Sequence, residues 1–232
     1  MRVGIIAAMA EEAKLLKEQL EDSKTTTVSR WHFCEGKLFG QSVIVVESGI
    51  GKVMAAAVAT ILLETFKADL LVNTGSAGGI GSHLKVGDVV IASKLAYSDV
   101  DVTAFNYDYG QMAQMPLYYV TSPELIARLD LAAQTVGLTT HLGLITSSDS
   151  FINTEKQRQD IITHFPTVLA AEMEGAAIAQ VAFAFQRPFV VVRAISDIAG
   201  RGNNEVSFET FITEAGNRSA KMVLSFLKQL TD

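Results

Sequence analysis

The chain has 232 residues, of which 49% are hydrophobic and 19% are charged. A chain of this length and hydrophobicity can bury roughly 70% of its extended surface, which argues against intrinsic disorder, collagen and coiled coil. The net charge of -6 argues against a nucleic-acid partner, because proteins that bind nucleic acids carry a basic patch.

The first segments combine a short buried strand with helical and β-rich patterns. The apolar run 3–8 predicts a strand and is far shorter than the roughly 20 residues of a membrane span, so we expect a cytoplasmic protein with no membrane partner. Residues 10–20 predict a helix, and 28–34 and 37–47 are β-rich. Cys34 is the only cysteine, which leaves no disulfide framework and no cysteine-based zinc site.

The rest of the chain alternates apolar strands with helical patterns. A helix over 52–66 is apolar almost all round and must be buried on most sides, and Ser122 followed by Pro123 is typical of a helix start. This alternation predicts one α/β domain, 1–232, with a largely parallel sheet covered on both faces. The further expected strands are 70–73, 89–92, 141–146, 168–172 and 189–195, and the further helices are 154–163, 175–185 and 208–230.

One long segment, 98–119, has no regular pattern but is rich in tyrosine, phenylalanine and methionine. Irregular segments of this length are usually functional or disordered, and the aromatic content argues against disorder. We interpret the segment as a pocket lid or a subunit contact. The low charged fraction of the whole chain also favours a surface that is partly covered by another subunit.

Carboxylates follow several of the expected strands. Ligands in such a sheet bind beyond the carboxyl ends of the strands, where Glu12, Glu174 and Asp197 lie. The glycine segments 49–51 and 75–81 do not match dinucleotide-binding or phosphate-binding loops, so we interpret them largely as tight strand-to-helix turns, which still permit backbone contact with a ligand. The four histidines lack the spacing of metal ligands.

Arg193 lies inside an apolar strand, where a buried cation must be paired. A structural ion pair and a catalytic role are equally compatible with this position. Strand alternation places Arg193 and Asp197 on the same face, unless a bulge intervenes. One of Glu11 and Glu12 is expected to be an ordinary first-turn acid that the helix dipole favours.

Seven short segments carry a resemblance to a known family. They are Gly4-Ile5-Ile6 with Met9 and Glu12, Ser48 to Lys52, Asn73 to Gly79, Asp101 to Phe105, Ser150 to Asn153, Glu172-Met173-Glu174 and Val190 to Asp197. With their order and spacing, they resemble the 5'-methylthioadenosine/S-adenosylhomocysteine nucleosidase family over essentially the whole chain. Each of these segments alone would be a weak signal.

The resemblance implies a nucleoside phosphorylase-like fold, which is a single-domain, three-layer α/β/α arrangement with a central mixed, largely parallel sheet. It further implies a homodimer with no metal and no organic cofactor. The implied reaction is hydrolysis of the N-glycosidic bond of methylthioadenosine, S-adenosylhomocysteine and 5'-deoxyadenosine, which releases adenine. Such a reaction serves methionine salvage and removes a by-product of methyl transfer.

The resemblance also implies residue roles. Asp197 corresponds to the acid that protonates adenine N7, and Glu12 to the residue that activates the attacking water. Glu174 is expected to bind the ribose hydroxyls. The supporting residues are Ser76 and Arg193 for the water and the carboxylates, Ser196 for Asp197, Phe151 and Ile152 for adenine, Phe208 as a cover, and Met9, Ile50, Gly78 and Met173 along the walls. Val102, Phe105 and Tyr107 would reach into the partner subunit's 5' pocket.

Three alternative functions remain open for this sequence. A nucleoside phosphorylase of the same fold would need cationic groups for phosphate, and Glu12 would repel that anion. An aminofutalosine nucleosidase would differ only in the 5' substituent of its substrate. A non-catalytic adenine-nucleoside binding protein would not need both Asp197 and Glu12.

Overall fold

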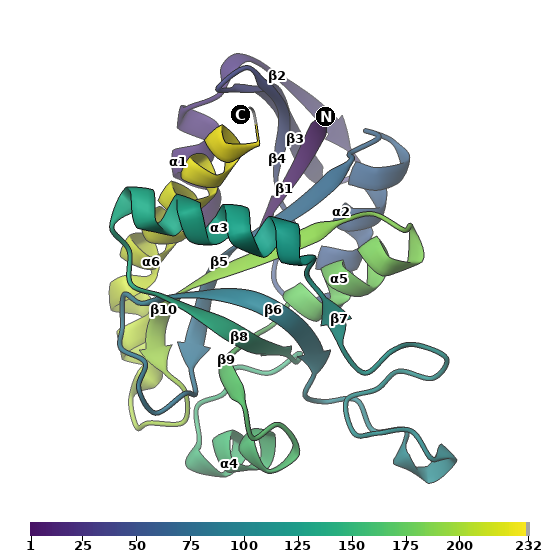
Figure 1. Cartoon of the computed structure of the whole chain (residues 1–232), viewed down its shortest axis with the longest axis vertical. Helices are drawn as coiled ribbons and strands as arrows, with labels where there is room; N and C mark the ends of the chain where they lie inside the picture. Colours follow the sequence, from purple (N-terminus) through teal and green to yellow (C-terminus); the bar gives the residue numbers. More distant parts are fainter. Residues whose placement is uncertain (231–232) are drawn as a thin grey trace.

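Ten strands form one mixed sheet in a computed structural model that describes residues 1–230. The last two residues of the expected domain 1–232 lie outside the described residues. The strand order is β10-β6-β8-β9-β5-β1-β4-β3-β2, with β7 paired to β6 (Figure 1). The strands are β1 (Arg2–Ala7), β2 (Glu21–Val28), β3 (Trp31–Leu38), β4 (Gln41–Glu47), β5 (Leu70–Gly79), β6 (Val89–Tyr97), β7 (Tyr119–Val120), β8 (Thr140–Ser147), β9 (Val168–Glu172) and β10 (Phe189–Ile198).

The sheet closes on itself at one end. Strand β10 pairs with both β6 and β5, so β5, β9, β8, β6 and β10 form a ring. Strands β1, β4, β5 and β10 run parallel to one another, whereas β2, β3 and β7 join by antiparallel pairings. The carboxyl ends of the parallel strands therefore meet at one edge, as expected for a ligand site in an α/β protein.

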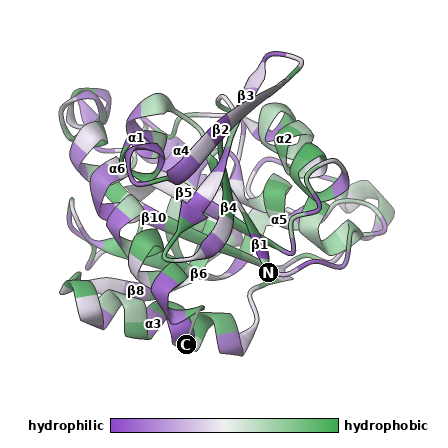
Figure 2. Ribbon diagram, turned by 90° about the horizontal axis from the view of Figure 1, so that it is seen from above, coloured by the Kyte–Doolittle hydropathy of each residue, from purple (hydrophilic) through white to green (hydrophobic). Residues whose placement is uncertain are grey.

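Helices cover both faces of the sheet and confirm the predicted α/β/α layers. Helices α1, α3 and α6 pack with one apolar cluster, and α2 and α5 pack with the other. Figure 2 shows hydrophobic residues along most of α2 and α5. Within residues 1–230, no helix is both long and apolar enough to cross a membrane. The helices are α1 (Ala10–Glu18), α2 (Lys52–Glu64), α3 (Pro123–Val136), α4 (Glu155–His164), α5 (Gly175–Ala184) and α6 (Asn204–Gln229).

The predicted strand boundaries near the N-terminus are wrong. The expected β-rich run 28–34 contains a turn, with φ of 55° at Ser29, and the run 37–47 is interrupted at Phe39 and Gly40. Strand β2 was not predicted because its side chains are polar and mostly exposed, which leaves no apolar alternation.

The prediction of a tight turn over 75–81 is also wrong for residues 75–79. Strand β5 continues through these glycines to Gly79, and its last two residues pair with β9. The segment 49–51 is a strand-to-helix turn as predicted, with φ of 85° at Gly49 and 96° at Gly51. The segment 98–118 is irregular apart from a 3-10 turn at Thr103–Phe105, and it projects from the body of the molecule (Figure 1).

Candidate active site

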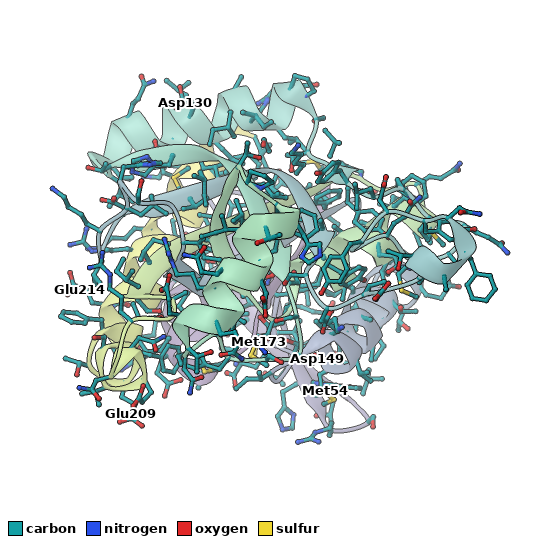
Figure 3. All side chains as sticks on the ribbon, turned by 90° about the horizontal axis from the view of Figure 1, so that it is seen from below. Met54, Asp130, Asp149, Met173, Glu209 and Glu214 are labelled. Atoms are coloured by element: carbon teal, nitrogen blue, oxygen red, sulfur yellow. The ribbon has the colours of Figure 1, made fainter. Side chains whose placement is uncertain are left out.

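A cavity of about 330 Å³ lies at the carboxyl ends of the parallel strands, a volume that suits a small-molecule ligand. In the view from below, Met173 lies toward the middle of this face and Glu209 toward its margin (Figure 3). The cavity brings together most of the expected site residues. It is lined by Met9, Glu12, Ile50, Ser76, Gly78, Phe151, Met173, Glu174, Ser196, Asp197 and Phe208, with Ala8, Ala77, Ala171 and Glu172.

The other expected residues lie elsewhere. Arg193 is only 1% exposed and contacts the cavity's carboxylates rather than the cavity itself. Ile152 is buried in a neighbouring apolar cluster, and its carbonyl accepts from Gly200 N at 3.1 Å. The remaining three, Val102, Phe105 and Tyr107, lie on the projecting segment, where Phe105 is 75% exposed.

Glu12 is held rigidly at the start of α1. Its Oε1 accepts from the backbone N and the Oγ of Ser76, both at 2.9 Å, and its Oε2 accepts from Ala8 N at 3.0 Å. A Cβ at Gly75 would lie 2.8 Å from Glu12 Oε1, so only glycine allows this approach. Burial raises the pKa of Glu12, although the charge of Arg193 and the Ser76 donors oppose the rise. A carboxylate with a raised pKa is a stronger base.

Glu11 is the ordinary first-turn acid of the pair. Its side chain is exposed on α1 and lies at an outer groove with Lys14 and Lys17. The first turn of α1 thus carries one carboxylate toward the cavity and one toward the outside.

Asp197 lies near the end of β10 and is buried, with 1% of its surface exposed. Ser196 Oγ donates to its Oδ1 at 2.9 Å, and Asn204 Nδ2 donates to its Oδ2 at 2.7 Å. Burial raises the pKa of Asp197, and these two hydrogen bonds moderate the rise. A carboxyl with a raised pKa can keep its proton closer to neutral pH, as a general acid requires.

Strand β10 contains a bulge that interrupts the alternation of its side chains. The register of β10 against β5 shifts between Ile195 and Asp197, so Ser196 is the extra residue. Arg193 and Asp197 consequently have different environments. Arg193 lies among buried polar groups beneath the cavity, whereas Asp197 lines it.

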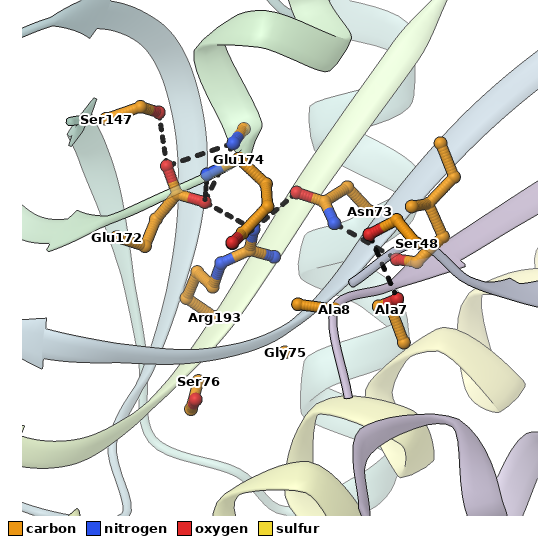
Figure 4. Close-up of polar contacts among 12 residues, drawn as sticks. Ala7, Ala8, Ser48, Asn73, Gly75, Ser76, Ser147, Glu172, Glu174 and Arg193 are labelled. Atoms are coloured by element: carbon orange, nitrogen blue, oxygen red, sulfur yellow. Dashed lines mark hydrogen bonds and ion pairs between the residues drawn. The ribbon is translucent and has the colours of Figure 1, made fainter. Parts of the chain in front are cut away.

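Arg193 connects the carboxylates at the end of β9 and at the start of α5 to the rest of the sheet. Its Nη2 donates to Glu172 Oε2 and to Asn73 Oδ1, and Ser147 donates to the other oxygen of Glu172 (Figure 4). Glu174 Oε2 lies 3.8 Å from the same Nη2. Although burial opposes its charge, Glu172 and Glu174 keep the pKa of Arg193 above its usual value. Arg193 thus forms the buried ion pair that was one of its two expected roles.

Glu174 occupies the N-cap position of α5, facing the turn after β4. Its Oε1 accepts from Gly51 N at 2.8 Å, and its second oxygen is the one nearer Arg193. Burial is the main cause of its raised pKa, and the neighbouring charge of Glu172 raises it further. Glu172 and Glu174 therefore place two carboxyl groups side by side at one wall of the cavity, and Arg193 lies within ion-pair distance of both.

Replacing Arg193 is expected to destabilise the protein. Arg193→Met leaves Glu172 buried without its cation, which should cost about 3–5 kcal/mol of unfolding free energy. The matched control is Arg218→Met, which removes an exposed pair with Glu214 and should cost less than about 1 kcal/mol. Urea unfolding measures both values, and equal losses would contradict the structural importance of the buried pair.

Sequence reasoning missed three polar residues that shape the site. Glu172 belongs to a segment of the family resemblance but has no expected role there, although Arg193 in an apolar strand requires a buried acid nearby. Asn73 accepts from Arg193 and donates to Ile6 O at 3.0 Å, which ties β5 to β1. Asn204 gave no sequence signal, because its contact with Asp197 depends on where α6 begins.

The described residues contain no group of three or more histidine, cysteine or acidic side chains arranged to hold a metal ion. None of the described residues that line the cavity is cationic, whereas four of them are carboxylic acids. The site can therefore offer acid–base groups and an apolar wall, but no direct charge partner for an anionic ligand.

A model of the phosphorylase superfamily matches residues 2–228 of this chain, which defines the class of protein. A 5'-methylthioadenosine/S-adenosylhomocysteine nucleosidase from Shewanella halifaxensis is 45% identical over 231 residues, which cover 99% of this chain and 100% of the relative. The chain belongs to the 5'-methylthioadenosine/S-adenosylhomocysteine nucleosidase family, as the sequence resemblance predicted.

Two solved structures have nearly the same fold. The S-adenosylhomocysteine nucleosidase from Streptococcus pyogenes, in complex with 5-methylthiotubericidin, has a TM-score of 0.97 and 46% identity, and the match covers 99% of this chain and 97% of that one. The nucleosidase from S. pneumoniae, with the transition-state inhibitor MT-ImmA, has a TM-score of 0.96 and 47% identity, with coverage of 99% and 100%. These values confirm the predicted phosphorylase-like fold.

Proposed function

We propose that this protein hydrolyses the N-glycosidic bond of methylthioadenosine and S-adenosylhomocysteine, and also of 5'-deoxyadenosine, to release adenine. The observation that carries the proposal is a single cavity that holds a rigid, buried Glu12 and a buried Asp197 with a raised pKa. The family relatives named above support the substrate class. The 5' sulfur substituent is common to the first two substrates.

The chemistry follows from the two carboxyl groups. Asp197 gives its proton to N7 of adenine while the bond between C1' and N9 breaks, and the bonding electron pair leaves with the base. Water attacks C1', and Glu12 accepts the proton that this water loses. The developing positive charge on the ribose lies near anionic side chains, as in glycosidases that use two carboxyl groups.

The remaining side chains position the substrate. Glu174 accepts hydrogen bonds from the ribose hydroxyls, and Met173 packs beside the sugar. Phe151 stacks on adenine, and Phe208, whose ring centroid lies 5.7 Å from that of Phe151, covers the base. Backbone groups of Ile152 contact the edge of the base. The other proposed contacts are the apolar walls at Met9 and Ile50, the close backbone at Gly78, and the carboxylate supports Ser76, Arg193 and Ser196.

Water is favoured over phosphate as the nucleophile. A phosphorylase must bind an anion beside C1', but the cavity is lined by four acids and, among the described residues, by no cation. The test is to incubate the protein with methylthioadenosine in phosphate-free buffer and to measure free adenine. Rapid release without phosphate supports hydrolysis, strict dependence on phosphate identifies a phosphorylase, and binding without release identifies a non-catalytic binding protein.

We also propose a homodimer in which each subunit completes the other's 5' pocket. Phe105 on the projecting segment and Val53 on the apolar helix α2 are 75% and 77% exposed, which favours a covered surface in the assembly. Val102 and Tyr107 lie on the same projecting segment. The single domain 1–232 and the cytoplasmic location remain part of this proposal, supported by the continuous sheet and the lone cysteine.

Phe105→Ala is expected to raise KM for methylthioadenosine about tenfold, because a buried aromatic ring contributes about 1.5–3 kcal/mol. The control is Phe39→Ala, which removes an exposed ring at the turn between β3 and β4, near the N-terminus and far from the projecting segment (Figure 1). Steady-state kinetics at several protein concentrations measures the effect. If KM is unchanged both in Phe105→Ala and on dilution of the protein to monomer, the proposal of a shared pocket is contradicted.

A further inference from the structure

Asn204, the first residue of α6, connects three parts of the site. Its side chain is 3% exposed, and its Nδ2 donates both to Asp197 Oδ2 at 2.7 Å and to the carbonyl of Ile152 at 3.1 Å. The chain turns into α6 through Asn203, whose φ of 64° is left-handed. The amide group of Asn204 thus links the proposed acid, the loop proposed to bind adenine and the helix that carries Phe208.

The orientation of this amide is fixed by chemistry. The Ile152 carbonyl can only accept a hydrogen bond, so the group of Asn204 that faces it must be the NH2. A flipped amide would point Oδ1 at two acceptors, Asp197 Oδ2 and the carbonyl, and would lose both bonds. In the observed orientation, Oδ1 is buried and has no hydrogen-bond partner within residues 1–230.

The two oxygens of Asp197 therefore differ. Oδ1 accepts from Ser196 Oγ, a hydroxyl that can rotate and also lies 3.4 Å from the carbonyl of Ala77. Oδ2 accepts from an amide that can only donate. A proton on Oδ1 leaves both contacts intact, whereas a proton on Oδ2 competes with the N–H of Asn204.

We propose that Asn204 is a positioning residue for the proposed hydrolysis: it holds Oδ2 of Asp197 as an acceptor, so that the carboxyl keeps one orientation and carries its transferable proton on Oδ1. The inference rests on the proposed function. Asn204 acts through Asp197 and is not itself required to contact the substrate.

The other charged groups near Asp197 act in a different way. Glu12 of α1 and Glu172 and Glu174 at the end of β9 line the same cavity, and Arg193 of β10 lies beneath it. Arg201 and Glu205, which flank Asn204, are exposed. A change at Asn204 removes a direct donor to Asp197 but leaves all of these charges in place.

The test compares Asn204→Leu with Asn217→Leu, the same substitution further along α6. Loss of an N–H donor to a carboxylate favours its protonated form, so Asp197 should keep its proton to higher pH in Asn204→Leu. The alkaline limb of kcat/KM for methylthioadenosine should move up by about one pH unit, since hydrogen bonds to charged groups have this strength. The acidic limb, assigned to Glu12, should stay in place.

In Asn204→Leu, the carboxyl group of Asp197 also loses its fixed orientation, which should lower kcat at neutral pH about tenfold, with a smaller change in KM. Asn204→Ser, which keeps a shorter donor, should recover part of both effects. Asn217→Leu should leave the two limbs where they are. An alkaline limb that does not move in a folded Asn204→Leu overturns the inference.

A measurement on the wild-type protein tests the inference even if the Asn204 variants do not fold. With asparagine labelled with 15N, the Nδ2 signal of Asn204 should titrate with the midpoint of the alkaline limb. An amide signal that does not respond to pH contradicts the contact. If wild-type protein releases no adenine, the proposed function fails, and the presence or absence of a pH response in the Asn204 Nδ2 signal still decides whether Asn204 contacts Asp197.

Discussion

Asp197→Asn is expected to lower kcat for adenine release by about 100-fold or more, the usual effect of removing a general acid. The fold should persist, because both contacts of the side chain can be kept. The new amide oxygen can accept from Asn204, and the new NH2 can donate to the Ser196 hydroxyl. The loss should therefore appear in kcat, with little change in binding of the nucleoside.

The stability of the same variant provides an independent check. Because burial raises the pKa of Asp197, the wild-type protein loses stability as pH rises through that folded pKa. Asparagine does not ionise, so the stability of Asp197→Asn relative to wild type should increase as pH rises above the ordinary aspartate pKa of about 3.9. Asp130→Asn, an exposed acid on α3, is the control. Full activity in Asp197→Asn would leave the residue with a structural role only.

Glu12→Gln is expected to reduce kcat by about 100-fold or more, because glutamine cannot accept a proton from the attacking water. The substitution also removes hydrogen bonds of the Glu12 side chain. The wild-type carboxylate accepts from Ser76 on one oxygen and from Ala8 on the other, so an NH2 in either place meets a donor. The lost hydrogen bonds should cost about 1–3 kcal/mol of unfolding free energy, partly offset by removal of a buried charge.

Glu11→Gln is the matched control for Glu12→Gln. The two glutamates are adjacent in the first turn of α1, but Glu11 is exposed and Glu12 is buried. The rate of adenine release at saturating substrate gives kcat for both variants, and circular dichroism shows whether each is folded. Equal activities in the two variants would exclude Glu12 as the activator of water.

The elements with a strong apolar pattern could be predicted from the sequence. Strand β9 occupies 168–172 as predicted, and α3 begins after Ser122, whose side chain accepts from Leu125 N. These segments have either a continuous apolar run or a capping residue, and both are local signals. The cavity could be located for a related reason, since its acids follow strands whose carboxyl ends meet.

What could not be predicted depends on contacts between distant segments. Strand β2 is polar and is defined only by its pairing with β3, so its sequence has no apolar period. The glycines of β5 resemble a turn, yet they extend a strand because its neighbours β9 and β10 approach closely. The bond from Asn204 to Asp197 joins a helix start to a strand end, and no spacing rule indicates it.

The most direct test of the proposed mechanism is a crystal structure of this protein with a non-hydrolysable adenine nucleoside that carries a 5' thioether. The proposed mechanism predicts that a carboxyl oxygen of Asp197 lies within about 3.2 Å of N7 of the base, while a water molecule bound to Glu12 faces C1'. A complex in which Asp197 lies beyond hydrogen-bond reach of N7 would contradict the proposed protonation and, with it, the assignment of the two carboxyl groups.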